Sequence, residues 1–212
     1  MLTIHHLRLS QSERIVWLAE ELGLEYELAL YKRRTDNRLA PDEYKALHPM
    51  GIAPVITDDD MVLGESGAIC EYIDRKYGGS RLSPGVDDAD FADHLFWLHW
   101  SNGTFMASLM MQLAVMMTEG LDKPAAAFVK DRVGRSWAMA EARLGEAEFF
   151  GGSKLTTADI MIVYILTTSR AFRDAPLDGF PNIKAYLQRI GARPAYQRAM
   201  AKAEPGWTPK LD

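Results

Sequence analysis

The first third of the chain places short apolar runs on either side of a segment with helical periodicity. Residues 2–7 (LTIHHL) and 26–31 (YELALY) have the length and composition typical of strands. Between them, apolar residues recur at three- and four-residue spacing until Gly23, which predicts a helix ended by a glycine. A strand, a helix and a strand in this order predict two parallel strands joined by a crossover.

A second group of elements completes this part of the chain. Pro41 opens a short helix, and residues 54–57 (PVIT) and 61–64 (MVLG) predict an antiparallel hairpin turned by three aspartates. A further helix follows and ends before Gly78 and Gly79. We therefore expect a small mixed sheet with helices on its faces.

After residue 78 the pattern changes to helices only. A stretch rich in glycine, serine, proline and acidic residues has no periodicity and predicts a linker. Helices are expected over 87–117, 124–147 and 155–172, with shorter ones beginning at Pro181 and Pro194. The sequence thus predicts an α+β domain over 1–78, a linker over 79–88 and an all-α helical domain over 89–212.

The segment 155–172 is too apolar to lie on a surface, so we expect it at the centre of the second domain. Thr156 and Asp159 have the spacing of a capping box, and Leu155 and Ile160 have the spacing of a hydrophobic staple. We interpret this motif as a folding signal without a chemical role.

The charge and the cysteine content narrow the functional classes. A net charge of −5 without a clustered basic face argues against a nucleic-acid-binding surface. No apolar run approaches the roughly 20 residues of a membrane helix. Cys70 is the single cysteine, and no cysteine–histidine cluster has metal-ligand spacing. We expect a cytoplasmic protein with no metal, no nucleic-acid partner and no membrane contact.

Pro54 stands at the start of a predicted strand, where its missing N–H costs no ladder hydrogen bond. An X–Pro bond is ordinarily trans. A cis bond here would leave the N–H and C=O of Ala53 free to pair with an extended, peptide-like ligand.

Glu65 and Ser66 stand at the start of the next predicted helix, where they can act as caps. The same position also favours an anion, because the first N–H groups of a helix are free and its dipole is positive there. Ser66 adds a hydroxyl donor and Glu65 can hold an ammonium group. The two residues together suit the amino-acid end of a small peptide.

Ser10 precedes the first predicted helix and forms a second capping-box pattern with Glu13. Alternatively, its hydroxyl donates to a ligand thiolate and lowers the pKa of the thiol, aided by the helix N-terminus. Ser12, which is also near the start of this helix, is an alternative donor to the thiolate. Cys70 shares a face with Ile69 and Ile73, so we interpret it as a core residue.

These motifs together resemble those of cytosolic glutathione transferases. HPMGIAPVI followed by GESGAI resembles the glutathione-site motif of the family, and LTTADI resembles the capping box of its helical domain. LSQSER, with a serine four residues before an arginine, resembles the active-site start of the serine-type classes. YKRR leading to APDEYKALHPMG is similar to a fungal and bacterial branch. The resemblance covers the whole chain in order and length.

The resemblance implies a thioredoxin-like N-terminal domain, an all-helical C-terminal domain and a homodimer. Pro54 would be a cis-proline, and Ala53 would pair with the cysteinyl backbone of glutathione. Glu65 and Ser66 would hold the γ-glutamyl end, and Ser10 would stabilise the thiolate. Arg38 and Lys45 are the candidates for the glycine carboxylate of this co-substrate.

Three departures from the family pattern stand out. His48 replaces the usual asparagine, Ala53 replaces valine or isoleucine, and Gly67 replaces the arginine that some classes carry after Glu-Ser. The last replacement removes one dimer or ligand contact that those classes have.

The second substrate should occupy an apolar cleft beside the thiolate. Met106, with Met110, Leu113 and Met117, repeats at helical spacing, which favours core packing but also suits adaptable contact with hydrophobic electrophiles. His99 and Asn102 lie on the same segment, near the point where it could meet the cleft.

The leading hypothesis is an enzyme of detoxification, a glutathione transferase that conjugates the thiolate to hydrophobic electrophiles. A glutathione-dependent peroxidase or disulfide reductase would share the site and attack oxygen or sulfur instead. A binding protein that carries hydrophobic ligands without turnover is the alternative from another class.

Overall fold

The computed structural model describes residues 1–118, 123–173 and 175–212. Its N-terminal part follows the order β1, α1, β2, α2, β3, β4 and α3. The bounds are β1 Leu2–Leu7, α1 Glu13–Leu22, β2 Glu27–Tyr31, α2 Asp42–Lys45, β3 Val55–Asp58, β4 Met61–Gly64 and α3 Ser66–Lys76.

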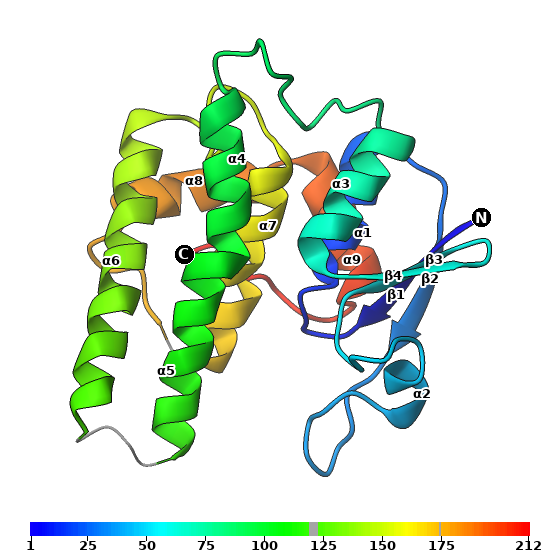
Figure 1. The fold of residues 1–212 in the computed structure, drawn as a ribbon, viewed down its shortest axis with the longest axis horizontal. Helices are drawn as coiled ribbons and strands as arrows, with labels where there is room; N and C mark the ends of the chain where they lie inside the picture. Colours follow the sequence, from blue (N-terminus) through cyan, green and yellow to red (C-terminus); the bar gives the residue numbers. More distant parts are fainter. Residues whose placement is uncertain (119–122, 174) are drawn as a thin grey trace.

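The four strands form a mixed sheet in the order β2-β1-β3-β4. β1 and β2 are parallel, with Ile4 opposite Leu28, and β3 and β4 are antiparallel, as predicted. β3 also pairs antiparallel with β1, which places Ile56 opposite Ile4. The thioredoxin-like α+β arrangement expected for this part of the chain is confirmed (Figure 1).

The rest of the described chain is helical. Its elements are α4 Phe91–Trp100, the π-helix η1 Ser101–Met106, α5 Ala107–Met117, α6 Pro124–Glu146, α7 Thr157–Leu166, the 3-10 helix η2 Thr168–Phe172, α8 Pro181–Gly191 and α9 Pro194–Ala203. The long helix expected over 87–117 begins at Phe91 and contains the π-helical segment, so it is not uniformly α-helical. The domain limits at 78 and 88 stay a prediction.

Helix α7 lies at the centre of the helical part, and all ten of its residues are buried. Its capping box is present: the Thr156 side chain caps the helix and Asp159 reaches back to the Thr156 N–H. Asp159 also accepts from the Phe150 N–H at 2.8 Å and from the Tyr186 hydroxyl at 2.9 Å. One buried carboxylate therefore joins the start of α7 to α8 and to the turn before α7.

The helix α9 leaves the helical bundle and packs on α1 (Figure 1). Arg193 pairs with Glu21 at 2.7 Å and Arg198 pairs with Glu20 at 2.9 Å. The rings of Trp17 and Tyr196 meet edge to face, 5.2 Å apart. This contact holds the residues after α9 against the turn between β1 and α1.

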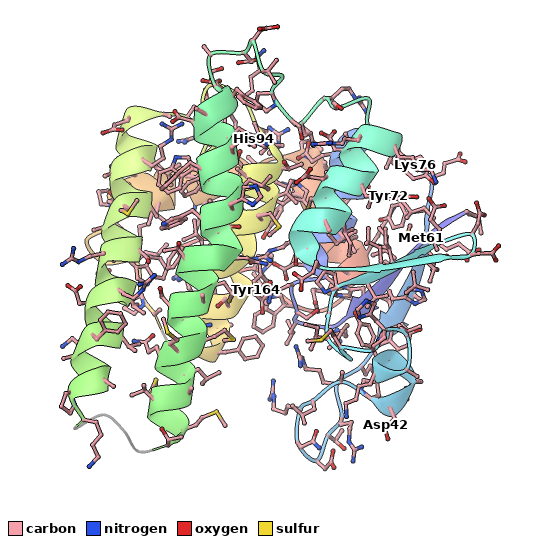
Figure 2. The ribbon with its side chains drawn as sticks, viewed as in Figure 1. Asp42, Met61, Tyr72, Lys76, His94 and Tyr164 are labelled. Carbon is pink, nitrogen blue, oxygen red and sulfur yellow. The ribbon has the colours of Figure 1, made fainter. Side chains whose placement is uncertain are left out.

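A charged cluster joins the end of β3 to α3. Asp58 at the end of β3 accepts from the Tyr72 hydroxyl at 2.8 Å and from the Lys76 ammonium at 2.6 Å. Tyr72 and Lys76 both project from α3 toward the hairpin (Figure 2). Hydrogen bonds from Lys76 and Tyr77 hold the pKa of Asp58 well below its usual range.

We expect Asp159→Ala to lower the free energy of unfolding by about 3 kcal/mol, because it leaves several buried donors unpaired. Asp131→Ala is the matched control. Its carboxylate pairs with Arg135 on the exposed side of α6, and such pairs contribute less than about 1 kcal/mol. Urea titrations of both variants measure the difference. Equal losses would contradict the role assigned to Asp159.

Candidate functional site

A cavity of about 370 Å³ lies where the β3–β4 hairpin, the start of α3 and the π-helix η1 meet. The site residues Ala53, Pro54, Glu65, Ser66 and Asn102, predicted from sequence, all line it. The other lining residues are Gln11, His48, Met50, Ile52, Val62, Leu63, Gly64 and Ala68. The structure therefore brings the two parts of the predicted peptide site into one wall and adds Asn102 from the helical part.

The peptide bond between Ala53 and Pro54 is cis, as the family resemblance implies. Pro54 is buried, whereas Ala53 is half-buried at the cavity wall. Neither the N–H nor the C=O of Ala53 has a hydrogen-bond partner within the described ranges. An extended ligand backbone can therefore bond to Ala53 as an added strand does.

Glu65 and Ser66 begin α3, with Glu65 in the N-cap position. Glu65 is exposed and has φ 69°, a left-handed conformation that costs a side-chain-bearing residue about 1–3 kcal/mol. Its side chain does not cap the helix. A strained acidic residue in the wall of a cavity is typical of a ligand contact and not of a structural cap.

Arg14 lies behind the cavity, is 1 % exposed and hydrogen-bonds to three of the residues that line it. Its Nη1 group donates to the Ser66 hydroxyl at 3.2 Å, to the Asn102 side-chain oxygen at 3.1 Å and to Gln11. Its Nε and Nη2 groups have no partner among the residues described. The guanidinium also lies over the Tyr164 ring, 5.2 Å from the centroid.

The charge of Arg14 is not neutralised by its neighbour Glu13. Burial lowers the pKa of Arg14 to about 10, so the guanidinium stays charged at neutral pH. Burial raises the pKa of Glu13 to about 8, so most of that carboxyl is uncharged at neutral pH. A positive charge therefore lies directly behind Ser66, and it favours an anion in the cavity.

Tyr164 on α7 faces the region between the two halves of the chain (Figure 2). Burial raises the pKa of its hydroxyl to about 12, and the charge of Glu13 acts in the same direction. The phenol is therefore neutral at neutral pH and offers a donor in that region.

Ser10 and Ser12 lie at the turn before α1, and both are buried. Their hydroxyl oxygens are 2.7 Å apart, and the Ser12 N–H donates to Ser10 Oγ at 3.2 Å. The capping box predicted for Ser10 and Glu13 is wrong, because α1 begins at Glu13 with Ser12 in the N-cap position. The Glu13 carboxyl instead accepts from the Thr168 hydroxyl of the helical part at 2.7 Å.

Several predicted residues lie outside the cavity lining. Ser10 is next to Gln11, which lines it, but is not part of the wall. His99 is exposed on α4, and Met106 is buried at the end of η1. Arg38 is exposed after β2, and Lys45 contacts Asp42 on α2 at 3.3 Å. Their assigned roles stay predictions.

The expectation of core packing for the row of apolar residues after Met106 is wrong in part. Met106 is buried, but Met110, Leu113 and Met117 are exposed on α5. The π-helical turn at 101–106 changes the direction in which the following helix presents its side chains. These residues form an exposed apolar surface.

A larger hollow, about 650 Å³, lies between α5 and α6. The described residues that line it carry no hydroxyl, carboxyl, thiol or imidazole group.

No group of three or more histidine, cysteine, aspartate or glutamate side chains within the described ranges is placed to hold a metal ion. No helix among these residues has the length and hydrophobicity to cross a bilayer. The smaller cavity at Ser66 thus has the converging polar groups expected of a site.

Comparison with known proteins agrees with this architecture. Residues 10–76 match the family model "Glutathione S-transferase, N-terminal domain", and residues 105–194 match "Glutathione S-transferase, C-terminal domain". Glutathione S-transferase 3 of Schizosaccharomyces pombe is 31% identical, with 96% of this chain and 88% of that protein covered. Glutathione S-transferase 1 of Saccharomyces cerevisiae is 28% identical over 96% and 95% of the two chains.

A solved structure is also similar over nearly its full length. The glutathione S-transferase from Actinobacillus pleuropneumoniae is 35% identical, with a TM-score of 0.86, and the match covers 96% of this chain and 93% of that one. The chain belongs to the glutathione S-transferase family.

The sequence analysis did not predict the roles of Arg14, His6 or Glu204. The spacing of Arg14 after Ser10 was part of the motif, but nothing in that spacing shows that the guanidinium is buried under Ser66. Glu204 is 198 positions from His6, to which it hydrogen-bonds. Such a contact depends on the docking of α9, which no local pattern predicts.

Cys70 is fully buried in α3, and burial raises the pKa of its thiol to about 12. Because the thiolate is the reactive form, we expect no labelling by a thiol-specific disulfide reagent in native buffer at about pH 8. Complete labelling is expected in denaturant, and mass spectrometry measures both. Rapid labelling of the native protein would contradict the assignment of Cys70 as a core residue.

Proposed function

We propose that the chain is a glutathione transferase that binds glutathione in the cavity at Ala53, Glu65 and Ser66 and conjugates its thiolate to small hydrophobic electrophiles. The observation that carries this proposal is the convergence of the free backbone of Ala53, the strained Glu65 and the buried charge of Arg14 on one cavity. Glutathione has an extended backbone, an ammonium and carboxylates, which match these three features in turn.

The γ-glutamyl end of glutathione carries an ammonium and a carboxylate on one carbon. The exposed Glu65 carboxylate is suited to the ammonium, with which it forms a charge-assisted hydrogen bond. The Ser66 hydroxyl, the first N–H groups of α3 and Arg14 behind them are suited to the carboxylate. Asn102 also bonds to Arg14 and lies beside this pair.

The cysteinyl part of glutathione pairs with the N–H and C=O of Ala53 in this proposal, which directs its sulfur toward the turn before α1. Ser10 donates its hydroxyl to the sulfur and stabilises the thiolate. Arg38 and Lys45 remain the candidates for the glycine carboxylate. The electrophile binds on the helical side, where we assign contacts to Asn102, Met106 and His99.

The chain acts as a cytoplasmic homodimer in this proposal. A buried, unpaired Cys70 suits a reducing compartment. Leu95 and Phe96 on α4 are exposed apolar side chains, which suit burial against a second copy.

We expect Ser10→Ala to shift the formation of bound thiolate to higher pH by about one unit or more, because it removes a hydrogen bond to the charged sulfur. The thiolate absorbance of bound glutathione in the ultraviolet measures this shift. The catalytic efficiency with an aryl halide should fall about 10- to 100-fold. Ser136→Ala, which removes a buried hydroxyl from α6, is the control.

A peroxidase or a disulfide reductase would show higher efficiency with a hydroperoxide or a mixed disulfide than with the aryl halide. Glutathione binding without turnover of any of these substrates would favour a carrier protein. Binding with an unshifted thiol would contradict the role of Ser10.

We expect Glu65→Gln to raise the KM for glutathione about tenfold or more, because a charge-assisted bond to the ammonium is worth about 1.5–3 kcal/mol. The free energy of unfolding should stay unchanged, since Glu65 is exposed. Glu71→Gln on the same helix removes a carboxylate that pairs with Arg75 and serves as the control. Steady-state kinetics with varied glutathione measure both variants. A KM for glutathione in Glu65→Gln equal to that of Glu71→Gln would exclude Glu65 as the ammonium contact.

A further inference from the structure

A continuous line of hydrogen bonds runs from Ser10 into the interior of the protein. Ser10 Oγ lies 2.7 Å from Ser12 Oγ, and Ser12 Oγ lies 2.8 Å from Nδ1 of His6. Nε2 of the same imidazole lies 2.9 Å from Oε1 of Glu204. Four side chains from β1, the turn before α1 and the residue after α9 thus form one chain that ends at a carboxylate.

This line is closed to solvent beyond Ser10. The side chains of His6 and Glu204 are both 0 % exposed, and Ser12 is fully buried. His5, the preceding residue on β1, points to the opposite face, where it contacts Tyr31 and Thr57. A proton that moves along the line therefore travels between Ser10 and the imidazole without meeting bulk water.

Three further charged or titratable groups surround the pair of His6 and Glu204. Arg8, directly after β1, donates from Nε to Oε2 of Glu204 at 3.2 Å. Arg33, after β2, is bonded to the carbonyls of Arg8 and Leu9 and lies within electrostatic range of Glu204. Glu13, at the start of α1, also lies within range of Glu204.

The charged groups around Glu204 are mainly cationic. Arg8 and Arg33 are cationic and stabilise the carboxylate. Burial raises the pKa of Glu13 to about 8, so this second carboxyl is mostly neutral and does not compete as an anion at neutral pH. An imidazolium next to Glu204 would be a buried, hydrogen-bonded ion pair.

The hydrogen atoms can be placed in two complete ways. In both, Ser12 Oγ accepts from the Leu7 N–H at 3.0 Å and Ser10 Oγ accepts from the Ser12 N–H. In the first arrangement His6 is neutral and donates from Nε2 to Glu204. The Ser12 hydroxyl then donates to Nδ1 of His6, and the Ser10 hydroxyl donates to Ser12. Ser10 has a free lone pair but no proton to offer a ligand.

In the second arrangement His6 carries protons on both nitrogens. It donates from Nδ1 to Ser12 Oγ, and the Ser12 hydroxyl donates to Ser10 Oγ. Both lone pairs of Ser10 are then occupied, and its own proton is free for a ligand. The contact from the Ser12 hydroxyl to the Leu7 carbonyl is longer, at 3.3 Å, and competes weakly. The two arrangements differ by one proton.

We propose that His6, through Ser12 and Ser10, takes up the proton that the glutathione thiol loses, so that thiolate formation and the donor state of Ser10 arise in one step. This inference rests on the proposed contact between Ser10 and the glutathione sulfur. His6, Ser12 and Glu204 are positioning residues that act through Ser10.

The step balances atom by atom. The thiol S–H bond breaks and its proton bonds to Ser10 Oγ, while the former Ser10 proton moves to Ser12 Oγ. The former Ser12 proton moves to Nδ1 of His6. The products are a thiolate that accepts from the Ser10 hydroxyl and an imidazolium paired with the Glu204 carboxylate. No proton leaves the protein and no bond to carbon changes.

The first test counts protons in the parent protein near neutral pH. Glutathione is added in weak buffer, the released protons are measured with a pH indicator, and the bound thiolate is measured by ultraviolet absorbance. S-methylglutathione, which has no thiol proton, gives the release that is due to the rest of the ligand. We expect the difference between the two ligands to be well below one proton per thiolate formed.

The second test uses His6→Gln, whose amide can still bond to Ser12 and Glu204 but accepts no proton. We expect the pH at which bound thiolate forms to rise by one unit or more, a tenfold loss of thiolate at fixed pH. Proton release should return to one per thiolate. Glu204→Gln should shift the transition in the same direction. His5→Gln, on the other face of β1, should keep the parental transition.

Two results would overturn the inference and leave the role of Ser10 in place. One is release of a full proton per thiolate by the parent, and this measurement does not depend on whether any variant folds. The other is a parental transition in a folded His6→Gln variant that binds glutathione. A parent protein that binds glutathione and forms no thiolate below the range of the free thiol would overturn the role of Ser10 itself and this inference with it.

Discussion

The packing of α9 on α1 is the contact on which the geometry of the site depends. The edge-to-face contact of Trp17 and Tyr196 lies between the two helices, and ion pairs from Glu20 and Glu21 flank it. Because both helices are rigid, this contact also fixes the residue that follows α9. Glu204 therefore meets β1 at His6 and the following turn at the Leu9 N–H. Residues from the two ends of the sequence thus build one buried hydrogen-bonded system.

The start of α1 contains two buried ionisable residues, Glu13 and Arg14, and their burial is unfavourable because they lose contact with water. Glu13 and Arg14 are adjacent and buried, yet each is directed to a different partner, the Thr168 hydroxyl and the Ser66 hydroxyl. A buried guanidinium with two unpaired nitrogen atoms is destabilising in the unliganded protein. An anionic group bound at Ser66 would offset part of that cost, so ligand binding and the stability of this region are linked.

Much of the fold follows from local patterns. Period-two and helical spacing gave the strands, the parallel and antiparallel pairings and the central position of α7. The wall formed by Pro54, Glu65 and Ser66 was also predictable, because β3, β4 and the start of α3 are consecutive and a hairpin places its ends together. The resemblance to a known family supplied the cis geometry at Pro54, which composition alone did not favour.

Contacts between distant segments could not be predicted in the same way. The expected capping box at Ser10 and Glu13 does not form, because the Glu13 side chain bonds to Thr168 in the other half of the chain. Exposure of Met110 and Leu113 depends on how α5 packs, and spacing alone does not distinguish an inward from an outward apolar row. Glu204 carries no signal of its role in the sequence around it.

The π-helical turn at 101–106 changes which way the side chains of α5 point relative to those of α4. One residue added to a regular helix rotates everything after it by about 100°. Asn102 faces the cavity, while the methionines that follow on α5 are turned toward solvent. A continuous rod can thus present two differently oriented surfaces without a break in its backbone hydrogen bonding. Changes in the sequence of α5 can then alter its outer surface while Asn102 keeps its place.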